Sequence, residues 1–343
     1  MIDTKSTELR VVTSRDVAEA AGVSQSTVSR AFSDQSKLSL KTRNRVLSVA
    51  EKLGYHPNAL ARSLISARSG LIGIVKRQHN NVMFTELLSE ITEQLQNTDY
   101  QVVYYEINEH QTIDEIVARI MQYRMDGIIL LSTTLSSKIT DSCKQMGIPV
   151  LQMQRYTSNV KTNLVLPDNQ GGTAMITDHL LDEGYKHFAY ISGELASSSN
   201  MDRQAGFIYS LEERGYGLPI IAPGDYTYQS GYEAMKRLVP VIQTPCGVLC
   251  ANDQMALGAI DAIRETDLSI PEDVGIVGYD DNFMASWPPY ELTSMRQPIK
   301  EMARRGVEIL LNNIDDPTLE PVTVSYPFEI VKRRSTDRKK ELC

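Results

Sequence analysis

Polar side chains in the C-terminal half of the chain follow short apolar runs, in the pattern of residues at the ends of buried strands. Asp168 ends the run NLVLPD, Asn252 lies in the run GVLCAND, and Asp280 lies in the run VGIVGYDD. Ligands of α/β proteins bind beyond the carboxyl ends of parallel strands. Carboxylates and amides at such ends can hold the hydroxyls of a small polar ligand. We therefore expect these three residues to belong to a binding site.

Two further residues extend this candidate binding site. Arg203 opens the helix that follows HFAYISG and can supply a guanidinium group. Tyr226, in GDYTYQSGYEAM, can stack on the apolar face of a sugar. Of the neighbouring carboxylates, Asp281 fits a structural role better than ligand binding, and Asp253 can cap the helix that follows it.

An enzymatic use of the same residues is an alternative. Asp168 and Asp280 could form an acid/base pair like that of a glycosidase. No nucleophile–base constellation accompanies them, however, and a carboxylate pair in a sugar cleft more often binds hydroxyls. The four cysteines form no CxxC pair and the five histidines have no metal-ligand spacing, so we expect free thiols, no metal and no cofactor.

A second chemical pattern lies near the N-terminus, in DVAEAAGVSQSTVSRAF. Its later half presents short hydrogen-bonding side chains and one arginine: Gln25, Ser26, Thr27, Ser29 and Arg30. Such side chains can reach base edges in the major groove, and an arginine can bind guanine through two hydrogen bonds. Further along, Lys41, Thr42, Arg43 and Arg45 are suited to phosphate oxygens.

Three short helices are expected to position these side chains. Thr13 and Ser24 are N-cap residues for the first two helices, and Gly22 between them suits a left-handed C-cap. A third helix is expected from Ser39 to Gly54, with Val46, Leu47, Ala50 and Leu53 facing inward. Two helices joined by a short glycine turn form a helix-turn-helix. The alternative is a three-helix bundle that only carries surface polar groups.

The charge of the chain is divided unequally. Residues 13–69 carry nine basic and four acidic side chains, which gives +5, whereas the whole chain carries −8 and the remainder therefore −13. A basic segment on an acidic body is typical of a protein in which only one part meets nucleic acid. No apolar run is long enough to span a bilayer, and the start of the chain has no apolar signal region, so we expect a cytoplasmic protein without a membrane partner.

The N-terminal segments TSRDVAEAAGVSQSTVSRAF and KTRNRVLSVAEKLGYHPNALARSL resemble the lactose-repressor/galactose-repressor family of bacterial transcription regulators, usually called LacI/GalR. RQAGF, ANDQMALGAI and VGYDD extend the resemblance to about residue 334. The resemblance implies a sequence-specific DNA-binding regulator, expected to repress carbohydrate-utilisation genes under allosteric control by a sugar-like effector. A cytoplasmic sugar-binding receptor without a DNA role is the alternative.

The resemblance also implies roles in DNA binding for individual residues. Gln25, Ser26 and Arg30 would read bases, and Arg15 would approach the duplex from the first helix. Leu64 would be inserted between base pairs in the minor groove, although ordinary helix packing is its alternative. Contacts to the DNA backbone are implied for Ser24, Thr27, Ser29, Lys41, Thr42 and Asn58.

The expected fold class is α/β, with an all-α helix-turn-helix head and a two-subdomain body like that of periplasmic binding proteins. The head covers 13–57, a hinge helix that orders only on DNA covers 58–69, and the body covers 70–336. Alternating apolar runs and helical stretches in the body indicate parallel sheets covered on both faces. The body is divided as subdomain 1, about 70–168 and 293–320, and subdomain 2, about 169–292 and 321–336.

In the body the resemblance places Arg203 at the family's effector-binding arginine and Tyr226 at an aromatic position that stacks on the ligand. The chain departs from the family after its first strand, where KRQHNNVMFTELL keeps only Phe84 of an aromatic pair. Lys76 and Arg77 in this segment could indicate an anionic effector, such as a uronate or a phosphorylated sugar. The alternative is a pair of charges that face solvent or a second subunit.

One head provides too few contacts for specific binding, so a homodimer on pseudo-palindromic operator DNA is expected. When bound to its operator, the protein would be associated with the nucleoid. The effector would act through its different affinities for the DNA-competent and DNA-incompetent states. Both an inducer and a corepressor fit this scheme.

Overall fold

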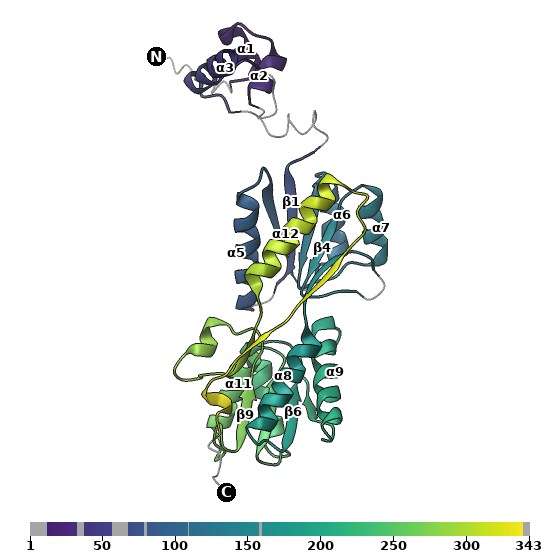
Figure 1. The fold of residues 1–343 in the computed structure, drawn as a ribbon, viewed down its shortest axis with the longest axis vertical. Helices are drawn as coiled ribbons and strands as arrows, with labels where there is room; N and C mark the ends of the chain where they lie inside the picture. Colours follow the sequence, from purple (N-terminus) through teal and green to yellow (C-terminus); the bar gives the residue numbers. More distant parts are fainter. Residues whose placement is uncertain are drawn as a thin grey trace, which may run out of the picture. The chain divides into compact units, whose positions relative to one another are not determined.

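The computed structural model describes residues 12–32, 38–56, 68–78, 81–108, 110–157 and 160–338, which belong to two compact units divided after Gly70. Figure 1 shows their elements. The first unit contains α1 (Ser14–Ala21), α2 (Gln25–Ala31) and α3 (Leu40–Leu53). The hinge helix expected at 58–69 falls almost wholly outside the described residues, as do the DNA contacts expected at Asn58 and Leu64.

The three helices pack around a small apolar core. Val17, Ala21, Val28, Val46 and Ala50 are buried in it. The expectation that Leu53 faces inward was wrong, because its side chain is 40% exposed and the buried face of α3 ends at Ala50.

The second unit contains two α/β subdomains. In the first, six parallel strands lie in the order β11-β5-β4-β3-β1-β2. Helices α5 and α12 pack on one face of this sheet, and α6 and α7 pack on the other. The bounds of these elements are β1 Leu71–Arg77, α5 Val82–Gln96, β2 Gln101–Ile107, α6 Ile113–Met121, β3 Gly127–Leu131, α7 Ser137–Gln145, β4 Val150–Met153, β5 Asn163–Pro167, α12 Ile299–Asp315 and β11 Thr323–Tyr326.

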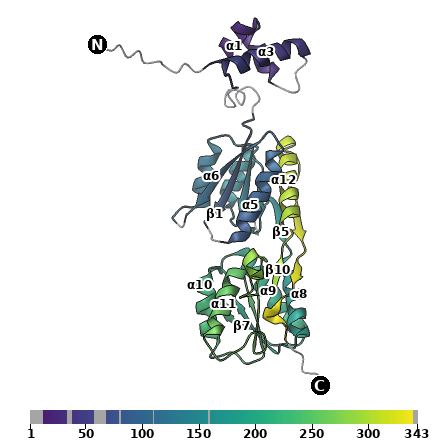
Figure 2. The same ribbon diagram turned by 90° about the vertical axis from the view of Figure 1, so that its left-hand side faces the viewer.

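The second subdomain has four parallel strands in the order β7-β6-β8-β9, with helices on both faces. Figure 2 shows α10 and α11 on one side of this sheet and α8 and α9 on the other. Both sheets are therefore covered on two faces, as the apolar runs indicated. The bounds are α8 Asn169–Asp182, β6 His187–Ile191, α9 Ser198–Glu213, β7 Ile220–Ala222, α10 Tyr228–Leu238, β8 Cys246–Cys250, α11 Asp253–Arg264, β9 Val274–Val277 and the 3-10 helix η1 Phe283–Ser286.

The chain passes between the subdomains three times, and two passages differ from the expected boundaries. The first passage lies at Asp168, between β5 and α8. The second lies after β10 (Ser294–Arg296) rather than near Leu292, because Thr293 and Arg296 form bridges to Val277 and Asp280 of the second subdomain.

The third passage lies after β11 rather than near Pro321. β11 pairs with β5, so residues 323–326 belong to the first subdomain. The chain then continues into β12 (Glu329–Val331), which pairs antiparallel with β10, and into the 3-10 helix η2 (Arg334–Thr336). Cys143, Cys246 and Cys250 are buried free thiols.

Candidate functional sites

The caps predicted for the helix-turn-helix are present. The Thr13 hydroxyl accepts a hydrogen bond from the Asp16 backbone N–H, and the Asp16 carboxylate accepts one from the Thr13 backbone N–H at 2.8 Å. Gly22 ends α1 with a φ of 63°, a left-handed conformation that favours glycine. The Ser24 hydroxyl then accepts a hydrogen bond from the Thr27 backbone N–H and starts α2.

This turn leaves one face of α2 exposed. Gln25, Ser26, Ser29 and Arg30 are exposed, whereas Thr27 is half-buried. Two contacts orient the longer side chains: Gln25 Nε2 donates to the Ser14 hydroxyl at 2.8 Å, and Arg30 Nε donates to the Ser26 carbonyl at 3.3 Å. The face therefore combines hydrogen-bonding groups of two lengths, as base-edge recognition requires.

Several candidate phosphate contacts flank this face. Arg15 and Lys41 are exposed, and Thr42 is half-buried, with its hydroxyl 2.9 Å from that of Ser39 at the start of α3. Arg43 instead donates through Nε to the Ala31 carbonyl at 3.1 Å and so ties α3 to the end of α2. Its expected contact with phosphate thus competes with a structural contact inside the unit.

A small cavity lies between the two subdomains of the second unit. Its volume is about 30 Å³, which is room for one or two water molecules. The predicted site residues Phe84, Arg203, Tyr226 and Asp280 line it together. Phe84 comes from α5 of the first subdomain and the other three come from the second, so the cavity is an interdomain site of the kind that holds small ligands.

Arg203 is buried in the wall of this cavity. Its Nε donates to the side-chain oxygen of Asn169 at 2.9 Å, and its Nη1 donates to the Ala251 carbonyl at 2.5 Å. The guanidinium carbon lies 3.7 Å from the ring centroid of Tyr279. Burial alone would lower the pKa of Arg203, but Tyr279 and Asp280 raise it above its ordinary value. A permanent positive charge is therefore fixed at the cavity.

Asp280 faces the same cavity from the segment that follows β9. Its carboxylate accepts hydrogen bonds from Asn81 Nδ2 at 2.8 Å and from Gln297 Nε2 at 2.9 Å. Burial raises the pKa of Asp280, while Arg203 and the two amide donors oppose that rise. The backbone φ of 113° is rare for a residue with a side chain, so the carboxylate is held in place by a strained turn.

Tyr226 is placed by two residues that do not line the cavity themselves. Gly193 makes room for its ring, because a Cβ on that glycine would lie 2.2 Å from the ring carbon Cζ. Asn252 donates from Nδ2 to the Tyr226 carbonyl at 2.9 Å, and it also caps α11 by accepting from the Met255 backbone N–H. Asn252 was predicted to contact ligand, but the structure places it behind Tyr226.

Asp168 is likewise not among the residues that line the cavity. Its carboxylate accepts a hydrogen bond from the Gly171 backbone N–H at 3.0 Å and caps α8. The arrangement does not bring Asp168 and Asp280 together in one cavity, so it lends no geometric support to the acid/base pair considered from the sequence.

Four polar residues of the cavity were missed by the sequence analysis. Asn81 starts α5, Gln154 and Arg155 follow β4, and Ser199 lies in the first turn of α9. Gln154 and Arg155 obey the same strand-end rule that selected Asp280. Asn81 and Ser199 lie at helix N-termini, and no spacing in the sequence connects them to the other site residues.

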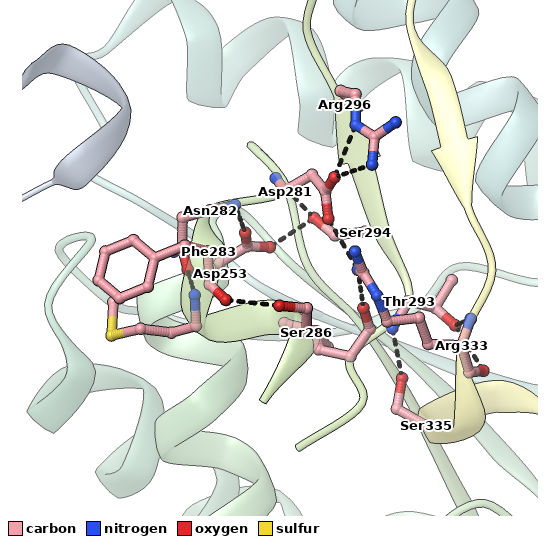
Figure 3. Close-up of polar contacts among 12 residues, drawn as sticks. Asp253, Asp281, Asn282, Phe283, Ser286, Thr293, Ser294, Arg296, Arg333 and Ser335 are labelled. Carbon is pink, nitrogen blue, oxygen red and sulfur yellow. Dashed lines mark hydrogen bonds and ion pairs between the residues drawn. The ribbon is translucent and has the colours of Figure 1, made fainter. Parts of the chain in front are cut away.

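The carboxylates next to the cavity have structural roles, which Figure 3 shows. Asp281 forms ion pairs with Arg296 and Arg333, each at 2.7 Å, and so connects β9 to the segments that carry the chain between subdomains. Asp253 accepts hydrogen bonds from the Asn282 backbone N–H and the Ser294 hydroxyl. Burial raises the pKa of Asp253 well above its usual range, and the nearby charge of Asp280 raises it further.

The basic pair after the first strand does not line the cavity. Lys76 is buried on β1 and forms an ion pair with Glu106 of the neighbouring strand β2 at 2.9 Å. Arg77 is half-buried at the end of the same strand. The positive charge of Lys76 is thus balanced by a carboxylate, and the second guanidinium of the cavity comes from Arg155 instead.

Comparisons with known proteins cover both units. Residues 13–58 match the bacterial regulatory proteins of the lacI family, and residues 177–336 match a periplasmic binding protein-like domain. The chain is 29% identical over 331 residues to Catabolite control protein A of Priestia megaterium. The aligned region covers 95% of this chain and 99% of that protein.

Two solved structures resemble the chain over nearly its whole length. The Lac repressor dimer bound to operator and the anti-inducer ONPF has a TM-score of 0.84 at 28% identity, covering 95% of this chain and 99% of that one. The complex of the transcriptional regulator CelR with cellobiose has a TM-score of 0.70 at 28% identity, covering 94% and 99%.

Within the described ranges, no helix is both long and apolar enough to cross a membrane. The same residues contain no group of three or more His, Cys, Asp or Glu side chains that could hold a metal ion.

Proposed function

This chain belongs to the lacI family of bacterial transcription regulators, and we propose that it is a repressor whose operator binding responds to a small polyhydroxylated effector. It is a DNA-binding regulator and not an enzyme. One observation carries the proposal: a helix-turn-helix with an exposed hydrogen-bonding face shares a chain with a cavity lined by Arg203, Asp280 and Tyr226. A receptor without a DNA role does not account for the first of these features.

In this proposal Gln25, Ser26 and Arg30 read bases in the major groove. Arg15 approaches the duplex from α1, and residues 58–69 form a hinge that orders on bent DNA, with Leu64 inserted in the minor groove. The exposure of Arg15, Gln25, Ser26 and Arg30 on one unit supports these roles. Contacts to the DNA backbone are proposed for Ser24, Thr27, Ser29, Lys41, Thr42 and Asn58.

The proposed effector lies between the subdomains. Arg203 and Asp280 bind its hydroxyls, and Tyr226 and Phe84 pack against its apolar faces. Asn252 supports the site indirectly by fixing Tyr226, and Asp168 does so by starting α8 where the chain first changes subdomain. The likeness to a regulator solved with cellobiose supports a sugar as the effector and carbohydrate utilisation as the controlled process.

A homodimer is proposed to bind a pseudo-palindromic operator from the cytoplasm, where it is associated with the nucleoid. The dimer in the operator-bound Lac repressor structure supports this state. Phe283, Trp287 and Tyr228 also support it, because these large side chains are 59%, 45% and 41% exposed. The hydroxyls of Tyr228 and Tyr290 both donate to the Asp261 carboxylate. The rings of Phe283 and Trp287 are in contact. These contacts place the three exposed aromatics on one side of the second subdomain.

The test has two stages. Purified full-length protein is used to select duplexes from a random pool, and the affinity for the selected duplex is compared with that for a scrambled duplex over a salt series. A regulator keeps a large preference for the selected duplex while both affinities fall steeply with salt. A panel of sugars is then screened for a change in that preference. The absence of any preferred duplex would overturn the proposal.

A further inference from the structure

The charges in the cavity are unevenly balanced. Three charged side chains line it: Arg155, Arg203 and Asp280. Two are guanidinium groups and one is a carboxylate. Because a buried charge is costly unless it is paired, the partners of these three groups indicate what a ligand must supply.

The two most deeply buried groups are bound by neutral partners. Arg203 donates to an amide oxygen and a backbone carbonyl, and Asp280 accepts from two amide groups. Among the described residues, neither group has an ion-pair partner within 4.0 Å. Arg203 uses Nε and Nη1 in these hydrogen bonds, and its guanidinium lies against the ring of Tyr279.

Arg155 differs, because its partner is a carboxylate from the opposite subdomain. Its Nη1 lies 3.1 Å from Glu194 Oε2, and the exposed fraction of the side chain is 12% for Arg155 and 37% for Glu194. Arg155 follows β4 in the first subdomain, whereas Glu194 follows β6 in the second. This ion pair therefore connects the two subdomains beside the cavity.

The backbone on both sides of Arg155 is held by hydrogen bonds to the second subdomain. The Gln154 carbonyl accepts from the Ser199 hydroxyl at 2.7 Å, and the Tyr156 backbone N–H donates to the Ser198 hydroxyl at 3.1 Å. Both bonds tie the segment to the start of α9. The guanidinium carbon of Arg155 also lies 5.6 Å from the ring centroid of Tyr226, which directs it toward the proposed effector site.

We propose that Arg155 binds an anionic group of the effector, a carboxylate or a phosphate, and that Glu194 is the internal carboxylate this group displaces. The inference rests on the proposed effector site. The cavity of about 30 Å³ is too small for a sugar, so the contacts around it must separate before a ligand enters. Glu194 can move into water at small cost, since it is more than one-third exposed.

The charge of the ligand follows from the state of Arg155 after Glu194 has been displaced. Once Glu194 has moved away, Arg155 presents a free planar fork of donors, which matches a carboxylate or a phosphate. A neutral ligand would leave that guanidinium without a counter-charge. The same reasoning does not apply to Lys76, because Glu106 pairs with it away from the cavity.

The experiment uses titration calorimetry on the full chain at constant ionic strength. The probes are matched sets that keep the sugar and change the charge: glucose, glucuronate and glucose 6-phosphate; galactose and galacturonate; ribose and ribose 5-phosphate. We expect one acid or phosphate to bind at least about tenfold more tightly than its neutral counterpart, the size of one hydrogen-bonded charge pair. The acid and phosphate members distinguish the two kinds of anionic group.

Two variants act in opposite directions if the proposal holds. Arg155→Gln removes the preference for the anionic member, whereas Glu194→Gln removes the internal competitor and strengthens its binding severalfold. If the ion pair only held the subdomains together, both variants would change binding in the same direction. Arg214→Gln is the matched control, because it breaks an arginine–carboxylate pair with Asp178 that lies outside the cavity, and it should leave binding unchanged.

Three results would overturn the inference: no anionic member binds, a neutral member binds as tightly as its acid, or Arg155→Gln keeps the preference. The proposed effector site is tested separately with Arg203→Gln. A neutral sugar that binds the wild type and is lost in Arg203→Gln leaves the site in place and removes only the role of Arg155. Binding that is unchanged in Arg203→Gln removes the site itself.

Discussion

Arg30 is the longest side chain on the exposed face of α2, and its contact with the Ser26 carbonyl directs it along that face. If it binds guanine through two hydrogen bonds, Arg30→Ala should cost about 1–3 kcal/mol of specific binding. Affinity for a scrambled duplex should change little, because that affinity comes mainly from phosphate contacts. Fluorescence anisotropy with the selected and the scrambled duplex, at one salt concentration, measures both.

Lys41→Ala is the control for this prediction. Lys41 is an exposed cation in the first turn of α3 and is suited to phosphate rather than to a base edge. Its loss should weaken both duplexes by a similar factor and make the salt dependence less steep. Equal losses on both duplexes for Arg30→Ala would place Arg30 on the DNA backbone instead.

At the same scale, the sequence predicts residue types at the cavity better than residue roles. Asp168 and Asn252 each lie between a strand and the next helix, where a side chain can either face a ligand or cap the helix. Both cap helices, and capping is a local interaction that sequence spacing does not distinguish from ligand binding. Arg155 follows β4 and so obeys the strand-end rule that selected Asp280, but its ion pair with Glu194 of the other subdomain is a tertiary contact that no sequence spacing indicates.

At the scale of elements, α10 and α11 approach each other closely because of glycine. A Cβ on Gly258 would lie 2.2 Å from the Tyr228 carbonyl oxygen and 2.8 Å from the Tyr232 nitrogen, both backbone atoms of the α10 region. Gly258→Ala should therefore force the helices apart. The clash should cost about 2 kcal/mol, which outweighs the roughly 1 kcal/mol that alanine gains over glycine in a helix, so the variant should be less stable than the wild type. Urea unfolding measures the difference.

The chain offers a matched control for this substitution. A Cβ on Gly217 would meet no atom within 4 Å, so Gly217→Ala should leave the unfolding midpoint nearly unchanged. Equal midpoints for the two variants would contradict the close approach of α10 and α11.

α8 is joined to η2 by a buried histidine. His179 Nε2 lies 2.8 Å from the Thr336 hydroxyl, and Nδ1 has no hydrogen-bond partner among the described residues. Burial, helped by the charge of Lys332, lowers the pKa of His179 from 6.5 to about 4. The unfolded chain therefore binds the proton first, and stability falls as the pH drops from 6.5 towards 4, by up to about 3 kcal/mol.

His179→Gln keeps a hydrogen-bonding side chain but does not titrate, so it should flatten this decline. Unfolding midpoints between pH 4 and pH 7 report the slope. His110→Gln changes an exposed histidine and should keep the slope of the wild type. A wild-type slope in His179→Gln would show that other groups cause the loss of stability in acid.

Element boundaries show where sequence patterns lose information. The long apolar strands and the capped helices were predicted, because burial on both faces and capping side chains leave strong patterns. β10 and β11 are short, and β11 alternates exposed and half-buried residues. Its membership of the first sheet depends on pairing with β5, which is distant in the sequence. Two subdomain boundaries were therefore displaced towards the start of the chain.

At the scale of the whole molecule, charge and symmetry determine how DNA is bound. Residues 13–69 are basic while the chain as a whole carries −8. An acidic body repels the duplex, so specific affinity has to come from the heads, and a single helix-turn-helix makes few contacts. A second copy doubles these contacts, which links the affinity for DNA to the strength of the dimer.

The exposed aromatics of the second subdomain allow that link to be tested. The ring centroids of Phe283 and Trp287 lie 5.6 Å apart, and both side chains remain largely exposed. If they lie at the dimer interface, Trp287→Ser should raise the dimer dissociation constant at least about tenfold, because buried aromatics dominate interface energies. Sedimentation velocity measures the dissociation constant, and operator affinity should fall in parallel. Tyr209→Ser removes an even more exposed aromatic from α9 on the other side of the sheet and should leave the dimer intact. Dissociation caused by Tyr209→Ser and not by Trp287→Ser would move the interface to that side.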